Sequence, residues 1–282
     1  MYMEDQSDIN AKMRAILVDW LIEVHTKFRL VPETLYLCIN ILDRYCKMVQ
    51  IRRSKLQLVG VTSLLIACKY EEIYPPEVRD CVFITDRAYT SSEVLDMEQD
   101  IVHRLGFKIT VPTAYPFLQR FLSMINASAL TKHAASYYTE RTLQEHDMLF
   151  YKPSLICIAA VVLAVNNADL SQQDKDSDGF DIGQGPGMVS FSNGNEVQEV
   201  HHMTLTFSLV YRKPSILLEY TGYSRYDIID CATHIAKKVS EEPVTASNRE
   251  LIAVKRKYDS KKYLHVSTSV NLPSVLQIQI DM

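Results

Sequence analysis

The most constraining feature of this sequence is the segment 11–28, which is apolar on almost every side of a helix. Its apolar residues recur at helical spacing, as Met13, Ile16, Leu17, Trp20, Leu21, Val24 and Phe28. Val18 and Ile22 fill the opposite side, and Asn10 precedes the segment as an N-cap. A helix that is apolar all round is enclosed by other elements. We therefore predict a helix at 11–28 that lies at the centre of a helical domain.

Four further helices are predicted in the first 110 residues, over 32–45, 55–70, 78–83 and from Thr90 to Gly106. Pro32 suits the first position of a helix, because the N–H that it lacks has no intrahelical partner there. Thr90 and Glu93 have the spacing of a capping box. The first half is therefore expected to hold five helices.

The second half repeats this rhythm, with helices predicted over 115–124, 130–149, 153–168 and 227–239. The segment 171–212 differs, because it holds five of the chain's eight glycines and no sustained hydrophobic period. We interpret it as a loop or a disordered insertion. Residues 248–265 contain a basic run, which we interpret as a solvated helix face. The sequence thus predicts an all-α protein.

Composition and charge exclude several kinds of partner. The formal net charge of -4 gives no electrostatic reason to expect nucleic acid. No apolar run reaches the roughly 18 residues of a membrane span, and the N-terminus lacks the regions of a signal peptide. We therefore expect no membrane partner and no secretion. The six cysteines form no CxxC pair, which is typical of reduced core thiols.

Motifs for catalysis and metal binding are incomplete in this sequence. Asp174, Asp176 and Asp178 match the first half of a calcium loop, but its twelfth position, which should be a bidentate glutamate, is Gly185. The histidines do not form H-E-x-x-H, and no serine lies in G-x-S-x-G. We expect no catalytic residue, no metal and no cofactor. Two helical halves without such a site indicate an interaction protein rather than an enzyme.

Several strings match one family pattern, namely MRAILVDWL at 13–21, KLQLVG at 55–60, KYEEIYPPE at 69–77 and YTGY at 220–223. Together they resemble the cyclin family, in particular the A/B-type mitotic cyclins. The pattern A-V-K-x-K-Y-x-S-x-K at 253–262 is similar to the C-terminal extension of B-type cyclins. The likeness covers residues 1–170 and 213–282.

The resemblance implies a fold of two tandem five-helix cyclin boxes. These would span 1–110 and 111–265, the second interrupted by 171–212, with 266–282 as a C-terminal tail. The implied function is that of a regulatory subunit, which binds and activates a cyclin-dependent Ser/Thr protein kinase as a heterodimer at the G2/M transition. Such a subunit is not an enzyme, helps to select substrates, and acts in the nucleus and cytoplasm.

The resemblance also implies a kinase-binding surface. In cyclins, a lysine and a glutamate at the positions of Lys69 and Glu98 bond the kinase around its mobile helix. The apolar part of the surface would comprise Ile66, Tyr70, Val102, Phe107 and Ile109. Periodicity alone favours a different interpretation, in which these five apolar residues belong to the core.

A second implied surface is a groove for R-x-L-type peptides of substrates and inhibitors. The matching positions are Met13, Ile16, Leu17, Trp20, Glu23, Leu56 and Gln57. Apolar residues would hold the leucine of the peptide, and a carboxylate would hold its arginine. From the pattern alone, a stripe of this kind belongs to the core.

Two charged sets complete the expected sites. By resemblance, Arg14 and Asp43 form a buried ion pair between the first two helices; the alternative is two solvated charges. His234, Lys237 and Lys238 lie close together on one predicted helix and are a candidate phosphate pocket. The alternative for these three is a solvated C-terminal turn.

The sequence departs from the family pattern at 171–212, where cyclins have a short link that ends in a tryptophan-containing segment. Trp20 is the chain's only tryptophan. A retained intron or an error in the gene model would explain both departures. Two other functions stay open at this point, a helical transcription adaptor built on cyclin-like repeats and a helical enzyme with an unrecognised site.

Overall fold

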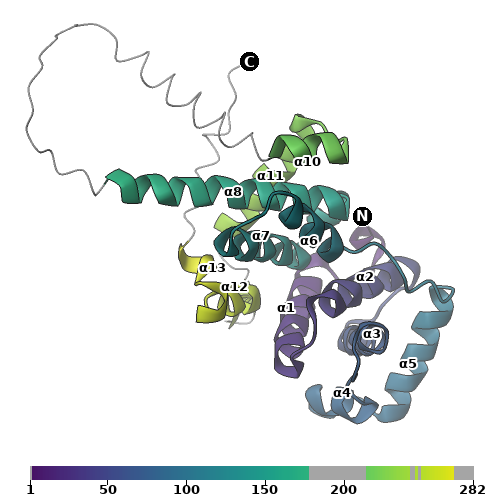
Figure 1. Ribbon diagram of the computed structural model, residues 1–282. Coiled ribbons are helices and arrows are strands. Elements are labelled where there is room, and N and C mark those ends of the chain that lie inside the picture. The colour runs from purple at the N-terminus through teal and green to yellow at the C-terminus, as the bar shows by residue number, and fades with distance from the viewer. Residues whose placement is uncertain (1, 178–213, 242–244, 247–248, 270–282) are drawn as a thin grey trace, which may run out of the picture.

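The computed structural model describes residues 2–177, 214–241, 245–246 and 249–269. These residues form an all-α protein of two consecutive helical units (Figure 1). Five helices make up each unit, so the predicted fold class of two tandem five-helix boxes is confirmed over the described residues. Within this part of the chain, β-structure is limited to one antiparallel pairing of two short strands. No described helix is long and apolar enough to cross a bilayer.

The N-terminal unit comprises α1 (Ala11–Phe28), α2 (Pro32–Met48), α3 (Leu56–Glu71), α4 (Val78–Ile84) and α5 (Ser91–Arg104). The central helix is α3 and not, as predicted, α1. Every residue from 58 to 68 is buried, since α3 packs against the other four helices. Helix α1 instead leaves one apolar stripe uncovered, where Ile16 is 38% exposed. The difference arises because α3 has no charged residue before Lys69, whereas α1 is interrupted by charges on its outer face.

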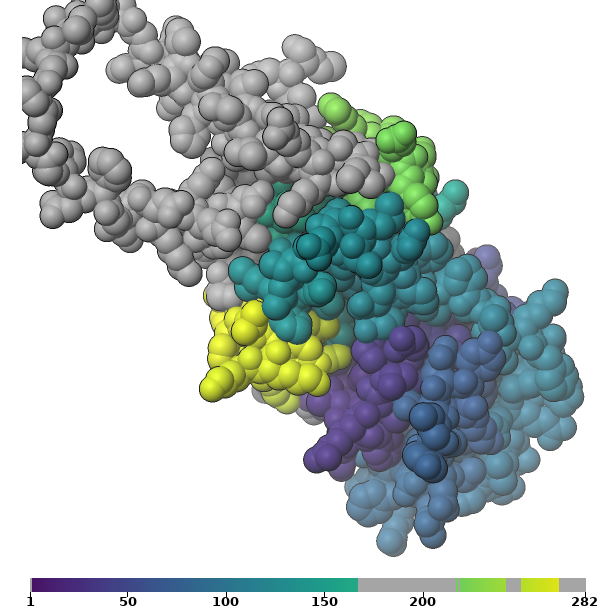
Figure 2. All heavy atoms as spheres, in the orientation of Figure 1, coloured from purple at the N-terminus to yellow at the C-terminus, as the bar shows by residue number. Residues whose placement is uncertain are grey.

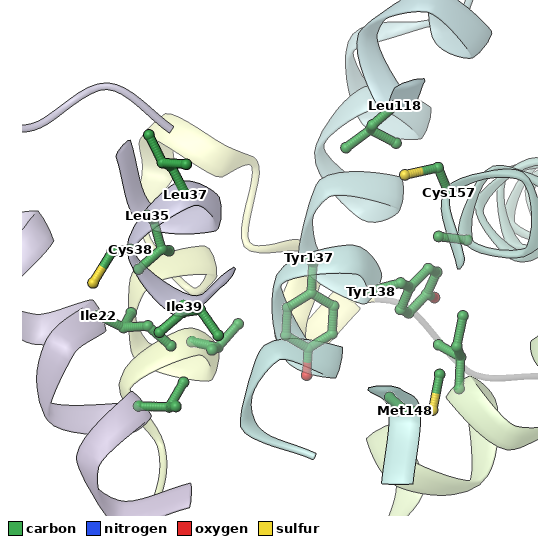
Figure 3. Close-up of a cluster of buried hydrophobic side chains, with 14 of the residues drawn as sticks. Ile22, Leu35, Leu37, Cys38, Ile39, Leu118, Tyr137, Tyr138, Met148 and Cys157 are labelled. Atoms are coloured by element: carbon green, nitrogen blue, oxygen red, sulfur yellow. The ribbon is translucent and has the colours of Figure 1, made fainter. Parts of the chain in front are cut away.

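The C-terminal unit comprises α6 (Ala114–Met124), α7 (Ala129–Arg141), α8 (Pro153–Ser177), α10 (Pro214–Thr221) and α11 (Arg225–Ser240). Helix α8 packs against α6, α7 and α11. Figure 3 shows side chains from the cores of both units, with Ile22 and Leu35 in the first and Tyr138 and Cys157 in the second. All six cysteines are buried and free, as predicted.

Two helix boundaries in the second unit differ from the predictions. The helix expected over 130–149 ends at Arg141, and two 3-10 turns follow, η3 (Thr142–Gln144) and η4 (Asp147–Phe150). The break brings backbone and side-chain groups of η3 against α1. Helix α8 continues to Ser177, so the loop predicted from 171 is wrong as far as that residue. The rest of the predicted insertion lies outside the described residues.

The C-terminal segment packs at one side of the molecule, where it contacts both units (Figures 1 and 2). It contains β1 (Thr245–Ala246), β2 (Arg249–Glu250), α12 (Ala253–Tyr258), η5 (Lys261–Tyr263) and α13 (Val266–Ser269). Helix α12 contacts α1 and α7. The predicted solvated face is therefore wrong for α12, where Val254 and Tyr258 are buried and Lys257 Nζ lies 2.7 Å from both carboxylate oxygens of Glu140.

Candidate functional site

The structure joins Arg14 of α1 to Asp43 of α2 through two hydrogen bonds. Arg14 Nε and Nη2 donate to the two carboxylate oxygens of Asp43 at 2.7 and 2.8 Å, and both residues are buried. Tyr2 Oη donates to the same carboxylate at 2.7 Å, and Arg14 Nη1 donates to the Leu143 carbonyl at 3.0 Å. Burial lowers the pKa of Arg14, but the charge and hydrogen bonds of Asp43, with a smaller contribution from Tyr2, together outweigh burial and raise that pKa above its usual value. The guanidinium therefore stays charged at a junction of both units.

Lys69, near the C-terminal end of α3, forms an ion pair with Glu98 on α5. Lys69 Nζ lies 2.6 and 2.8 Å from the two oxygens of the Glu98 carboxylate. The lysine side chain is 47% exposed and the glutamate 18%. An exposed pair of this kind contributes about 0–1 kcal/mol to stability. Both side chains can therefore exchange this bond for bonds to a partner protein at little cost in stability.

Two aromatic residues of the predicted kinase-binding surface are exposed. Tyr70 is 48% exposed and Phe107 is 68% exposed, which the core interpretation does not explain. The Tyr70 hydroxyl and Thr110 Oγ1 are 2.5 Å apart, so the segment after α5 is tied to the end of α3. Phe107 has a φ of 59°, directly after Gly106 at 58°, and a non-glycine residue adopts that conformation at an energetic cost.

The other predicted apolar residues of this surface are less accessible. Val102 and Ile109 are half-buried, and Ile66 is buried in the core. Two exposed residues that the sequence analysis did not single out are Ile73 and Tyr74, which are 86% and 91% exposed beyond the end of α3. The sequence signal for these two exposed residues is that they are apolar and stand between Glu71-Glu72 and a proline pair. We call these residues the α3–α5 surface: the exposed Lys69, Tyr70, Ile73, Tyr74 and Phe107, and the half-buried Glu98.

A groove of about 550 Å³ lies where α1 meets the start of α3. All seven residues predicted for the peptide groove line it, namely Met13, Ile16, Leu17, Trp20, Glu23, Leu56 and Gln57. The two helices approach closely, because a Cβ at position 60 would lie 2.7 Å from Leu17 Cδ1. Glycine, which has no Cβ, is the residue that leaves room at position 60 for the observed Leu17 side chain.

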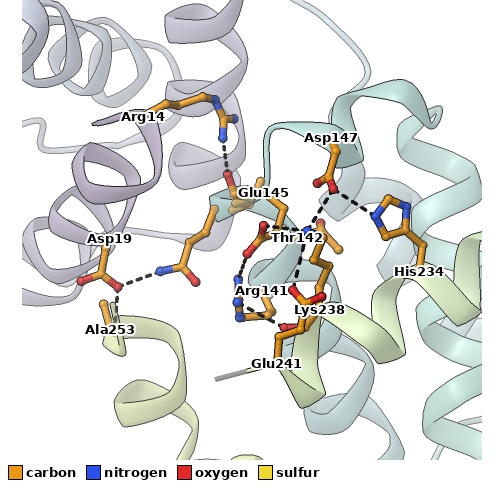
Figure 4. A network of polar contacts seen from close by, with 12 residues as sticks. Arg14, Asp19, Arg141, Thr142, Glu145, Asp147, His234, Lys238, Glu241 and Ala253 are labelled. Carbon is orange, nitrogen blue, oxygen red and sulfur yellow. Dashed lines mark hydrogen bonds and ion pairs between the residues drawn. The ribbon is translucent and has the colours of Figure 1, made fainter. Parts of the chain in front are cut away.

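Three further residues line this groove, and the sequence analysis missed them. Arg53 precedes α3, Asp19 lies on α1, and Leu251 comes from the C-terminal segment. Asp19 Oδ1 accepts bonds from Gln144 Nε2 at 2.7 Å and from the Ala253 backbone N–H at 2.8 Å (Figure 4). Helical periodicity gives no signal for Leu251, because its place depends on how the end of the chain packs against α1.

The candidate phosphate residues lie among carboxylates. Asp147 is 3.1 Å from His234 Nε2 and 3.0 Å from Lys238 Nζ (Figure 4). Lys238 also lies 3.5 Å from a Glu145 oxygen, whereas Lys237 is exposed and is not part of this cluster. Burial lowers the pKa of Lys238, but its bond to Asp147 and the charges of Glu145, Asp147 and Glu241 together outweigh burial and raise that pKa. The site's cations are thus matched by acidic groups, and the phosphate pocket stays a prediction.

Family models cover most of the chain. The model described as "Cyclin, N-terminal domain" matches residues 1–110, and "Cyclin, C-terminal domain" matches 112–178 and 203–272. The gap between the last two matched segments falls inside the predicted insertion. The herpesvirus saimiri viral cyclin has a similar solved structure, with a TM-score of 0.63 and 19% identity over 85% of this chain and 90% of the viral one. This likeness concerns the fold.

Curated relatives give the same family. The chain is 51% identical to rice (Oryza sativa subsp. japonica) Cyclin-B2-1 over 58% of this chain and 39% of the relative. It is 38% identical to the human G2/mitotic-specific cyclin-B2 over 96% of this chain and 57% of the relative. The chain thus spans between 39% and 57% of the length of these two relatives. The chain belongs to the cyclin family, and these relatives are B-type cyclins.

Proposed function

We propose that this chain is a regulatory subunit that binds and activates a cyclin-dependent Ser/Thr protein kinase during G2/M, in the nucleus and cytoplasm. The observation that supports this most directly is the partly exposed Lys69–Glu98 pair, together with the exposed rings of Tyr70 in α3 and Phe107 after α5. Exposed aromatic groups and a partly exposed charged pair on neighbouring elements are suited to binding a protein partner, because the rings supply apolar area and the charges supply directional bonds. The resemblance to B-type cyclins supports a cyclin-dependent kinase as that partner.

Activation requires only that the α3–α5 surface bind one conformation of the kinase better than the other. The kinase helix that packs on this surface carries a glutamate, which must reach the ATP-positioning lysine in the active state. A subunit with higher affinity for that state shifts the population toward it. On this proposal, the chain contributes binding energy and performs no bond chemistry itself.

Substrate selection is assigned to the groove between α1 and α3. Its apolar residues, among them Met13, Ile16 and Trp20, can enclose a leucine side chain. Glu23 lies on the same stripe of α1 and offers a carboxylate to an arginine of the peptide. The groove is therefore suited to R-x-L-type segments of substrates and inhibitors.

The decisive experiment adds the purified chain to a monomeric cyclin-dependent kinase and follows phosphorylation of a histone peptide. We expect a large rise in rate, which Lys69→Ala/Glu98→Ala abolishes together with kinase binding. The matched control is Lys55→Ala/Glu93→Ala, because these residues form a more exposed ion pair at 2.8 Å near the N-terminal ends of the same two helices. Equal loss in both double variants would contradict the proposed interface. Duplex DNA binding at moderate salt, without kinase activation, would favour the transcription-adaptor alternative.

A further inference from the structure

The acidic position of the groove is paired with a cation from the chain itself. Arg256 of α12 donates from Nη1 to Glu23 Oε1 at 3.0 Å. The arginine side chain is 61% exposed and the glutamate side chain 29%. The contact joins residues that are 233 positions apart in the chain. Glu23 is the carboxylate that an arginine of a docked peptide would use.

Buried contacts of α12 fix the place of this arginine. Asp19, four residues before Glu23 on α1, accepts from the backbone N–H of Ala253, three residues before Arg256. The two contacts therefore step along both helices in the same direction. On the α7 side, Lys257 bonds Glu140, and both side chains are less than 10% exposed. Helix α12 is thus held on two sides by buried contacts, while the guanidinium of Arg256 lies at the solvent edge.

The ion pair between Arg256 and Glu23 can be broken at little cost to stability. An exposed ion pair contributes little to stability, so a peptide arginine can displace Arg256 without undocking α12. A second cation, Arg53, also lines the groove. Arg53 is itself paired with Asp8 at 2.7 Å, so Arg256 is the cation that acts directly on Glu23. An incoming basic peptide therefore meets a carboxylate that is already partly neutralised. A peptide that relies on its leucine meets no such opposition.

We propose that Arg256 is an internal competitor for the arginine of docking peptides and so sets the charge specificity of the groove. This inference rests on the proposed docking function of that groove. It means that the groove binds R-x-L-type peptides more weakly than its apolar residues and Glu23 alone would. The peptide's arginine then contributes less to affinity than its leucine does.

The test measures binding of a fluorescent R-x-L peptide, and of the same peptide with citrulline in place of arginine, by anisotropy. We expect Arg256→Gln to tighten binding of the arginine peptide about two- to fivefold, the range that an exposed ion pair commands. The citrulline peptide should bind both proteins equally. The matched control is Lys255→Gln. Lys255 is the exposed neighbour of Arg256 on the same helix, and its substitution also removes one positive charge. The gain should shrink at high salt.

The outcomes separate the inference from the proposed function. Weaker binding to Arg256→Gln would mean that Arg256 orients Glu23 for the peptide, which overturns the competitor role. An equal gain in Lys255→Gln would show a general charge effect and would overturn it too. If neither peptide binds the wild-type chain, or if Trp20→Ala leaves their binding unchanged, the docking function itself fails. Thermal unfolding of the two variants should match that of the wild type.

Discussion

Arg14 shows how a charged side chain is accommodated in a protein core. A buried guanidinium is costly unless its donors are satisfied, and here Asp43 and the Leu143 carbonyl accept three of its hydrogen bonds. The Asp43 carboxylate accepts a further bond from Tyr2. The pair therefore orders the N-terminal segment, α1 and the η3 turn around one charge. It also explains why an arginine can follow Met13 on a helix whose other side is apolar.

Asp43→Asn is predicted to lower the free energy of unfolding by about 3–5 kcal/mol, because it leaves the buried Arg14 charge without its counterion. Urea denaturation followed by circular dichroism measures this. The control is Asp8→Asn, since Asp8 pairs with Arg53 at 2.7 Å on the surface, and it should cost about 1 kcal/mol or less. Similar losses in the two variants would show that Asp43 does not compensate a buried charge.

Two buried histidines make the fold sensitive to acid. Burial, and then the charge of Lys257, lowers the pKa of His25; burial, and then the charge of Arg14, lowers that of His146. The unfolded chain therefore binds more protons than the folded one as the pH drops below about 6.5. We predict a smaller free energy of unfolding at pH 5.5 than at pH 7.5. In His25→Gln, the difference between these two values should be smaller than in the wild type. The same substitution at exposed His103 is the control, and a flat profile would refute the prediction.

At the scale of elements, the groove depends on how closely α1 and α3 approach. The stripe of α1 and the first residues of α3 were identified from the sequence because they lie within the strings that resemble cyclins. Periodicity alone would have placed them in the core, and it cannot tell a covered stripe from an open one. The structure leaves this stripe open because no helix of the N-terminal unit covers it. Leu251 and Arg256 could not be predicted, because their positions depend on long-range docking of α12.

Gly60→Ala is predicted to narrow the groove. The new Cβ would lie 2.7 Å from Leu17 Cδ1, so the Leu17 side chain must turn toward the groove. Displacing it costs about 1–3 kcal/mol, partly offset by the roughly 1 kcal/mol gain in helix propensity. We expect R-x-L peptide affinity to fall about three- to tenfold, while kinase binding through Lys69 at the other end of α3 is unchanged. Unaltered peptide affinity would show that Leu17 does not shape the site.

At the scale of the whole molecule, the two units are joined by polar contacts as well as by packing. Arg14 bonds the carbonyl of Leu143, and Asp19 bonds both Gln144 and the backbone of Ala253. These contacts place the 3-10 turn after α7 and the start of α12 against α1. The same aspartate that anchors the C-terminal segment also lines the groove. The proposed docking of a substrate and the cohesion of the two units therefore depend on one face of α1.

Asp19→Ala is predicted to uncouple the unfolding of the two units. Trp20, the chain's only tryptophan, reports on α1 by fluorescence, whereas far-ultraviolet circular dichroism reports on all helices. In the wild type the two urea transitions should coincide, as expected of one cooperative structure. Removing Asp19 deletes two bonds to a charged acceptor, each worth about 1.5–3 kcal/mol, so the transitions should separate. Asp19→Asn keeps one acceptor oxygen and should have a smaller effect. Coincident transitions in Asp19→Ala would mean that the bonds of Asp19 do not couple the two units.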